Sequence, residues 1–144
     1  MCGIGGVGGE RATAADVQRM TAALAHRGPD DDQHVVVPGA AFGHRRLAII
    51  DVVNAKQPKG SEDGRWWLTF NGEIYNYREL APPLVAERPL RTRSDTEVLL
   101  RSFMRRDVNC LRDLRGMFAF AAYDAHKRRL VLARDHLGQK PLYY

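Results

Sequence analysis

Residues 117–135 read MFAFAAYDAHKRRLVLARD. Two largely apolar runs, MFAFAAYD and RLVLARD, lie on either side of the short polar segment 125–128. Runs of this kind with a short connection predict two antiparallel strands, because parallel strands need a crossover of a dozen or more residues. The stretch therefore favours a fold built on an antiparallel sheet.

Similar β-rich runs recur upstream in the sequence. Pro38 and Gly39 separate two of them and predict a hairpin. Another run breaks at Asn71-Gly72, a dipeptide typical of two-residue turns, so we expect a turn there. The four upstream runs, which begin at residues 1, 33, 41 and 65, are MCGIGGV, QHVVVPG, AFGHRRLAIID and RWWLTFNGEIYN.

Helix signals lie between these strands. Three helices are expected to begin after an N-cap residue, which is Thr13, Asn76 or Ser94, and another short helix is expected at about Val108 to Leu114. The prolines at 82–83 are expected to end or kink the second helix early, because Pro lacks the N–H that a helix interior needs. The third helix opens with SDTE, residues 94–97, which has the form of a capping box. Strands, helices and strands joined by hairpins predict an α+β fold with an antiparallel sheet.

Length, composition and charge limit the class of protein. A chain of 144 residues, 44% hydrophobic and 27% charged, is enough for one globular domain. No apolar run approaches the ~18 residues that span a bilayer, and no signal peptide is visible, so we expect a cytoplasmic protein that does not bind membranes. Cys2 and Cys110 should then stay reduced, and their separation argues against a metal site. The net charge of +5 comes from scattered arginines, which favours a solvated basic face over a nucleic-acid surface.

Cys2 is the first candidate for chemistry. Removal of Met1 would leave a thiol and a free α-amine on one residue, which places a nucleophile beside a possible base. Only a few per cent of an ordinary thiol is ionised at neutral pH, whereas part of the α-amine is neutral and able to take a proton. The simpler alternative is a cysteine without function at a frayed chain end.

Two sets of polar residues add to this candidate. The Asn71 amide and the Gly72 N–H could together hold a developing oxyanion. Arg46 could bind a carboxylate with two parallel hydrogen bonds, while Glu73 and Asp95 could accept from an ammonium group. Together they describe a site for a zwitterionic amino acid. The structural alternatives are a hairpin turn at Asn71-Gly72, a surface strand for Arg46, a turn charge for Glu73 and a favourable helix N-terminus for Asp95.

The motifs together resemble the class II glutamine amidotransferase domain. They are most similar to those of asparagine synthases of the glutamine-hydrolysing type, and the resemblance covers practically the whole chain. NGEIYNY together with HRGPD is highly specific to this family. In chain order, the motifs are MCGI, HRGPD, HRRLAIID, FNGEIYNYREL, RSDTEVLL, GMFAFAAYD and RDHLGQKPLYY.

The resemblance implies a fold and a reaction. The fold is the N-terminal nucleophile hydrolase sandwich, in which two antiparallel sheets lie between helix layers in the order αββα. Cys2 would attack the side-chain amide of glutamine and form a glutamyl thioester. Asn71 and Gly72 would form the oxyanion hole. Ammonia would leave, and water would release glutamate.

The resemblance also implies how the ligands are bound. Arg46 would bind the α-carboxylate of L-glutamine, and Glu73 and Asp95 would bind its α-amine. No cofactor is expected in this chain. Members of the family continue past KPLYY, so residues 1–144 are expected to be an incomplete glutamine amidotransferase domain whose final run begins a strand. ATP, Mg²⁺ and aspartate would bind to a missing synthetase domain of the ATP-pyrophosphatase type, and a homodimer is one expected assembly.

Three alternatives stay open at this point. Another class II amidotransferase, serving aminosugar or purine synthesis, would share the site, although HRRLAIID with NGEIYNY favours the asparagine branch. A non-catalytic domain of the same fold would have no reason to retain Cys2. A basic nucleic-acid binder would lose affinity steeply as salt rises.

Overall fold

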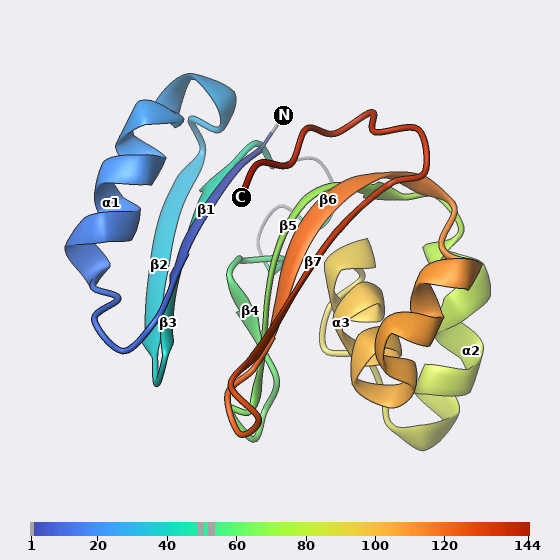
Figure 1. The fold of residues 1–144 in the computed structure, drawn as a ribbon. Helices are drawn as coiled ribbons and strands as arrows, with labels where there is room; N and C mark the ends of the chain where they lie inside the picture. The colour runs from blue at the N-terminus through green and yellow to red at the C-terminus, as the bar shows by residue number, and fades with distance from the viewer. Residues whose placement is uncertain (1, 49–50, 52–53) are drawn as a thin grey trace.

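Two antiparallel sheets face each other, and helices cover their outer sides in the order helix, sheet, sheet, helix (Figure 1). The computed structural model describes residues 2–48, 51 and 54–144. The first sheet has the order β1-β3-β2 and the second β4-β5-β6-β7. The observed layers agree with the αββα sandwich and the α+β class that the sequence predicts.

The bounds of the elements follow the chain in order. The strands are β1 Gly3–Gly8, β2 Asp31–Val37, β3 Ala40–Arg46, β4 Lys59–Gly60, β5 Trp66–Ile74, β6 Gly116–Asp124 and β7 Arg129–Arg134. The α-helices are α1 Ala14–Ala23, α2 Tyr77–Glu87 and α3 Asp95–Arg106. Two 3₁₀-helices are η1 Ala25–Arg27 and η2 Asp107–Asp113.

In the first sheet, β3 is the central strand. The predicted hairpin at Pro38-Gly39 is confirmed, because Val37 pairs with Ala40. β1 pairs antiparallel with β3 on its other side. A Cβ at Gly3 would lie 2.8 Å from the Cβ of Leu24, so the glycine lets the end of α1 approach the strand closely. Because side chains alternate along a strand, the neighbouring Cys2 faces the second sheet instead.

The second sheet carries the larger hydrophobic core. The predicted antiparallel strands at the end of the chain are confirmed as β6 and β7. Even-numbered residues of β5 face α2 and α3, where Leu68 and Phe70 pack in one cluster with Phe103. Odd-numbered residues face the first sheet, where Trp67 packs beside the cluster that contains Phe42. Asn71 and Glu73 are odd-numbered and therefore lie on the inter-sheet face.

The prediction of a turn at Asn71-Gly72 is wrong. Both residues lie inside β5, where Asn71 pairs with Ala119 and Gly72 with Phe118. Full-length pairing with β6 overrides the local turn preference of the dipeptide. The glycine is needed for a different reason, since a Cβ at Gly72 would lie 2.1 Å from the carbonyl oxygen of Met117.

The helix starts follow the sequence in part. Thr13 forms a complete capping box with Asp16. Ser94 accepts from the N–H of Glu97 at 3.3 Å, but the Glu97 carboxylate accepts from Arg91 and Thr92 rather than from Ser94. Half of the capping box predicted at Ser94 is therefore formed.

The second helix departs from expectation at both ends. Asn76 caps no helical N–H; its amide donates to the Asp113 carbonyl and accepts from the Arg115 N–H, which ties α2 to the start of β6. The helix also continues through the prolines at 82–83. Its later part is stabilised from outside, since the Arg101 guanidinium donates to the carbonyl of Leu84 at 2.7 Å.

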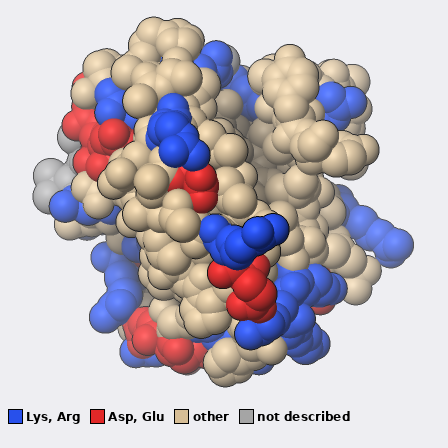
Figure 2. All heavy atoms as spheres, turned by 60° about the vertical axis from the view of Figure 1, so that its left-hand side comes forward, with Lys and Arg blue, Asp and Glu red and all other residues tan. Residues whose placement is uncertain are grey.

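Three further features are the length of the helices, the path of the last run and the distribution of surface charge. No helix among the described residues is long and apolar enough to cross a membrane. The last run, 137–144, forms no strand and instead returns toward the start of β1 (Figure 1). Lys and Arg side chains lie among Asp and Glu on the face shown in Figure 2. In surface ion pairs such as Arg19–Asp16 and Arg128–Glu10, a carboxylate lies beside an arginine.

Candidate active site

One cavity lies at the end of the inter-sheet space where β1 begins and β3 ends. All six residues predicted from the sequence line it: Cys2, Arg46, Asn71, Gly72, Glu73 and Asp95. The other lining residues are Leu47, Ala55, Gln57, Phe70, Thr96, Met117 and Lys140. We call this space the Cys2 cavity. Its walls come from segments that are far apart in the sequence, so the fold and not local sequence brings them together.

The thiol of Cys2 is held against the residue that follows β3. The N–H of Leu47 lies 3.4 Å from Sγ and can donate to it, while the thiol can donate to the Leu47 carbonyl at 3.7 Å. The Arg27 guanidinium donates to the Cys2 carbonyl at 3.1 Å. Cys2 is a free, half-buried thiol. The Cys2 carbonyl is therefore anchored by Arg27, and its sulfur is held by Leu47 in the wall of the cavity.

Arg46 reaches the cavity from the last position of β3. Ala40 and Phe42 pack in the inter-sheet cluster, so alternation places Arg46 on the same face. Only 6% of its surface is exposed. Its guanidinium donates to the Asp51 carbonyl at 3.0 Å. The Asp51 carboxylate in turn accepts from the Arg93 N–H, which lowers the pKa of Asp51 and connects this corner to the start of α3.

The edge of β5 that faces away from β6 also borders the cavity. On this edge the Phe70 N–H donates to Gln57 Oε1 at 2.7 Å, and the Ile74 N–H donates to Asp95 Oδ2 at 3.0 Å. Backbone groups alternate along a strand, so the N–H of Gly72 points to the same edge between these two. It lies beside the Asn71 side chain in the wall of the cavity.

Asp95 begins α3 and is 5% exposed. Burial raises the pKa of its carboxyl, the nearby Glu73 carboxylate raises it further, and the N–H groups of Ile74 and Thr96 oppose the increase. A buried carboxylate beside a second one favours a positively charged partner. The two acidic side chains share the cavity with the cationic side chains of Arg46 and Lys140.

Lys140 was missed in the sequence reasoning. It is 4% exposed and lines the Cys2 cavity. Asp135 sets its place, because this carboxylate accepts from the N–H groups of Phe118, Gln139 and Lys140. The signal was an Asp at the start of the DHLG turn that could organise the backbone after it. No local sequence pattern predicts that His44 lies between the sheets or that Gln57 forms hydrogen bonds to the backbone of Phe70.

Within residues 2–48, 51 and 54–144, no group of three or more His, Cys, Asp or Glu side chains is arranged to hold a metal ion. Cys110, the second cysteine, is buried, and burial raises the pKa of its thiol to about 12. At neutral pH this thiol is protonated and therefore a poor nucleophile.

Comparison with known proteins identifies relatives of the whole chain. The family described as "glutamine amidotransferase domain" matches residues 1–144. Glutamine-hydrolyzing asparagine synthetase 1 of Bacillus subtilis is 44% identical over 151 residues, which cover 100% of this chain and 24% of that protein. Glutamine-hydrolyzing asparagine synthetase B of Escherichia coli is 37% identical over 147 residues, covering 99% of this chain and 26% of that protein. The chain therefore spans about a quarter of the length of these relatives.

A solved structure has the same fold. Glutamine phosphoribosylpyrophosphate amidotransferase from B. subtilis, complexed with ADP and GMP, matches with a TM-score of 0.71 and 21% identity. The match covers 94% of this chain and 37% of that chain. The layered sandwich is thus the N-terminal nucleophile fold of an amidotransferase. Because the family model matches residues 1–144, the chain belongs to the glutamine amidotransferase domain family.

Proposed function

We propose that the protein hydrolyses the side-chain amide of L-glutamine in the Cys2 cavity. The observation that carries the proposal is that one cavity collects a thiol, an arginine, a strand-edge N–H beside an amide, and two acidic side chains. These groups match the parts of a glutamine molecule one by one. Family membership supports the same reaction.

The amino-acid end of glutamine is bound by charge. Arg46 binds the α-carboxylate, because a buried guanidinium can form two parallel hydrogen bonds to it. Glu73 and Asp95 accept from the α-ammonium group, which compensates the unfavourable burial of the Asp95 carboxylate beside Glu73. This arrangement leaves the side-chain amide of glutamine directed toward Cys2.

The chemistry begins after Met1 is removed. The α-amine of Cys2 takes the thiol proton, Sγ bonds to the amide carbon, and the carbonyl oxygen becomes an oxyanion. The Asn71 amide and the Gly72 N–H donate to this oxyanion. The C–N bond then breaks, and the leaving nitrogen takes the proton to depart as ammonia. Water hydrolyses the thioester to glutamate and restores the thiol.

The destination of the ammonia is proposed from the relatives. Two of them are named as glutamine-hydrolyzing asparagine synthetases, so we infer that ammonia is transferred to an ATP-activated aspartate. ATP, Mg²⁺ and aspartate would bind outside these residues. The enzyme would act in the cytoplasm and could form a homodimer, with no nucleic-acid or membrane partner. An acceptor in purine synthesis is the alternative that the phosphoribosylpyrophosphate amidotransferase fold keeps open.

The proposal is tested by comparing the two cysteines. Wild type, Cys2→Ala and Cys110→Ala are assayed for glutamate and ammonia release from glutamine. We expect Cys2→Ala to abolish both products without changing Tm. Cys110→Ala should retain turnover, because its thiol is buried in the α3–η2 core outside the Cys2 cavity. Undiminished hydrolysis by Cys2→Ala would refute the assignment.

A further inference from the structure

Two side chains that take no part in the proposed reaction hold the peptide between Phe70 and Asn71. The Phe70 carbonyl accepts from Gln57 Nε2 and from His44 Nε2, each at 3.1 Å. The Phe70 N–H donates to Gln57 Oε1 at 2.7 Å. Three hydrogen bonds therefore fix the backbone immediately before the proposed oxyanion donors.

The Gln57 side chain takes the place of a strand partner. β4 pairs with β5 only at Leu68 and Trp67, through Lys59 and Gly60. Continuing that register would put residue 57 opposite Phe70. The primary amide of Gln57 supplies one donor and one acceptor there, which are the groups that a backbone partner would offer. Since Gln57 is 6% exposed, water cannot readily replace it.

His44 approaches the same carbonyl from the first sheet. It is buried, and burial is the main reason that the pKa of its imidazole falls to about 4. The ring is therefore neutral at pH 7. Because a carbonyl can only accept, the proton is on Nε2; Nδ1, buried as well, has no hydrogen-bond partner in the described part of the chain. The imidazole thus makes a single directed contact.

The Phe70 carbonyl and the Asn71 nitrogen belong to one rigid peptide plane. Fixing this plane fixes the Cα of Asn71 and, through the next plane, the N–H of Gly72. On the far side, Asp95 holds the N–H of Ile74. The segment Asn71–Glu73 is therefore anchored at both ends while its own donors border the cavity.

We propose that Gln57 and His44 are positioning residues that hold the Asn71 amide and the Gly72 N–H where the oxyanion forms. This inference rests on the proposed glutaminase function. Neither residue touches the reacting atoms. Their removal should therefore impair stabilisation of the transition state more than binding of glutamine. Displacing a catalytic group by about 1 Å can cost on the order of a hundredfold in rate.

The experiment uses substitutions that remove the contact and keep the bulk. Gln57→Met and His44→Leu are compared with wild type for kcat, KM for glutamine, Tm, and the rate of Cys2 alkylation by iodoacetamide. We expect kcat to fall roughly 10- to 100-fold while KM changes less than about threefold. Alkylation should be unchanged, because it needs the thiol but no oxyanion hole. His44→Gln, which retains an N–H donor, should recover part of the loss.

Thr69→Val is the matched control. Thr69 precedes Phe70 on β5, is buried, and lies outside the Cys2 cavity; its Oγ1 has no partner within the described residues. The substitution should leave kcat and KM as in wild type.

The outcomes separate the two proposals. If wild type hydrolyses glutamine and Cys2→Ala does not, but Gln57→Met and His44→Leu retain kcat, the positioning role is wrong and the function stands. If kcat and alkylation fall in parallel with Tm, the residues stabilise the fold only, and the positioning role is again wrong. A wild-type protein without glutaminase activity would overturn both.

Discussion

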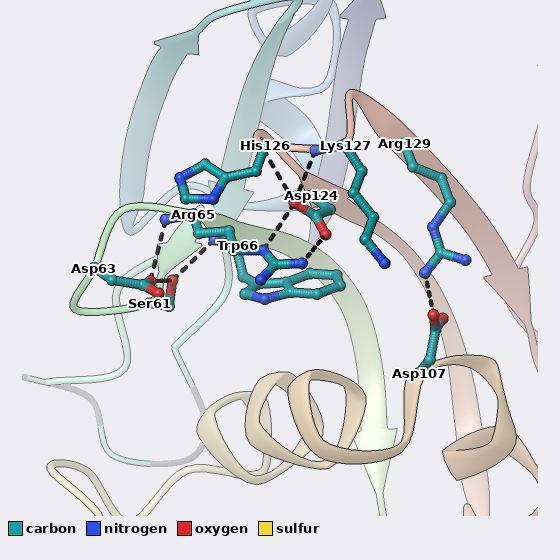
Figure 3. A network of polar contacts seen from close by, with 9 residues as sticks. All are labelled: Ser61, Asp63, Arg65, Trp66, Asp107, Asp124, His126, Lys127 and Arg129. Carbon is teal, nitrogen blue, oxygen red and sulfur yellow. Dashed lines mark hydrogen bonds and ion pairs between the residues drawn. The ribbon is translucent and has the colours of Figure 1, made fainter.

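Two buried aspartates near opposite ends of β5 behave in opposite ways. Asp124 pairs with Arg65 through Oδ1 at 3.0 Å and Oδ2 at 2.6 Å, and Oδ1 also accepts from the N–H groups of His126 and Lys127 (Figure 3). Its pKa falls to about 2, chiefly because of Arg65. At the other end, burial raises the pKa of Asp95, and the like-charged Glu73 raises it further.

The difference supports the placement of the ligand at the Asp95 end of the sheet. Around Asp124 the protein satisfies its own charge, so this carboxylate fixes the turn between β6 and β7. At the other end the protein buries the Asp95 carboxyl group beside a second carboxylate, an arrangement that favours a positively charged partner. Buried groups with unfavourably shifted pKa values cluster at functional sites for this reason.

The largest effect is expected from Asp95→Asn. The amide oxygen can still accept from Ile74, but the charge that we propose binds the α-ammonium group is lost. We expect kcat/KM for glutamine to fall about 10²- to 10³-fold, which corresponds to the loss of one partner of a buried charge pair. Tm should be unchanged or raised, because an unfavourably buried carboxylate is removed. An equal effect of Asp124→Asn on kcat/KM would break the comparison.

Asn71→Ala should have the next largest effect on activity. Removing one oxyanion donor should lower kcat roughly a hundredfold or more, with a smaller change in KM. Steady-state kinetics with glutamine would check this split. A rise in KM at constant kcat would assign Asn71 to ground-state binding instead.

Asp124→Asn should act on stability alone. The substitution removes the charge from the pair with Arg65, whose side chain is 30% exposed, so we expect a loss of about 2 kcal/mol in the free energy of unfolding. Denaturant titration would measure the loss. Activity at a temperature where the variant is folded should match wild type. Glu10→Gln, at the exposed pair with Arg128, is a control for loss of a surface charge.

The smallest effect is expected in the pH dependence of stability. The folded-state pKa of Asp124 is depressed, so its contribution is full above the unfolded value near 3.8 and is lost as pH falls toward about 2. After allowance for the exposed Arg65, this amounts to on the order of 1–2 kcal/mol. Asp95 has the opposite sign: its folded-state pKa is raised, so stability increases as pH falls through that raised value.

Denaturation curves between pH 7 and pH 2 would separate the two carboxyl groups. Asp95→Asn should remove the gain on mild acidification, and Asp124→Asn should reduce the loss at lower pH. Identical profiles for both variants would contradict the contrast between the two ends.

The sequence predicted most of the fold because its strongest signals are local. The hairpin at Pro38-Gly39 and the Thr13 cap need only neighbouring residues. The turn prediction at Asn71-Gly72 fails for the same reason: the turn preference of the dipeptide is local, whereas its pairing with Ala119 and Phe118 is not. The prolines at 82–83 do not end the helix, and the support that Arg101 gives it comes from another helix.

The candidate site was predictable as a set of residues but not as a structure. Motif resemblance selected the six residues, and the fold places them in one cavity. Lys140, Gln57 and His44 could not be assigned from sequence. Their positions depend on the Asp135 turn, on where β4 stops and on how the sheets face each other. These positions depend on long-range contacts, which the local patterns of a single sequence do not predict.

The spacing of the cavity residues along the chain also sets an order in time. Ribosomes add on the order of 5–20 residues per second, so the chain between Cys2 and Lys140 takes on the order of ten seconds to make. Throughout that interval the thiol exists but its pocket does not, because β5, α3 and the segment after β7 are still to come. Under the proposed function, a nascent chain should therefore release no ammonia from glutamine. The proposed reaction would start only when the last wall of the cavity has been synthesised and both sheets have docked.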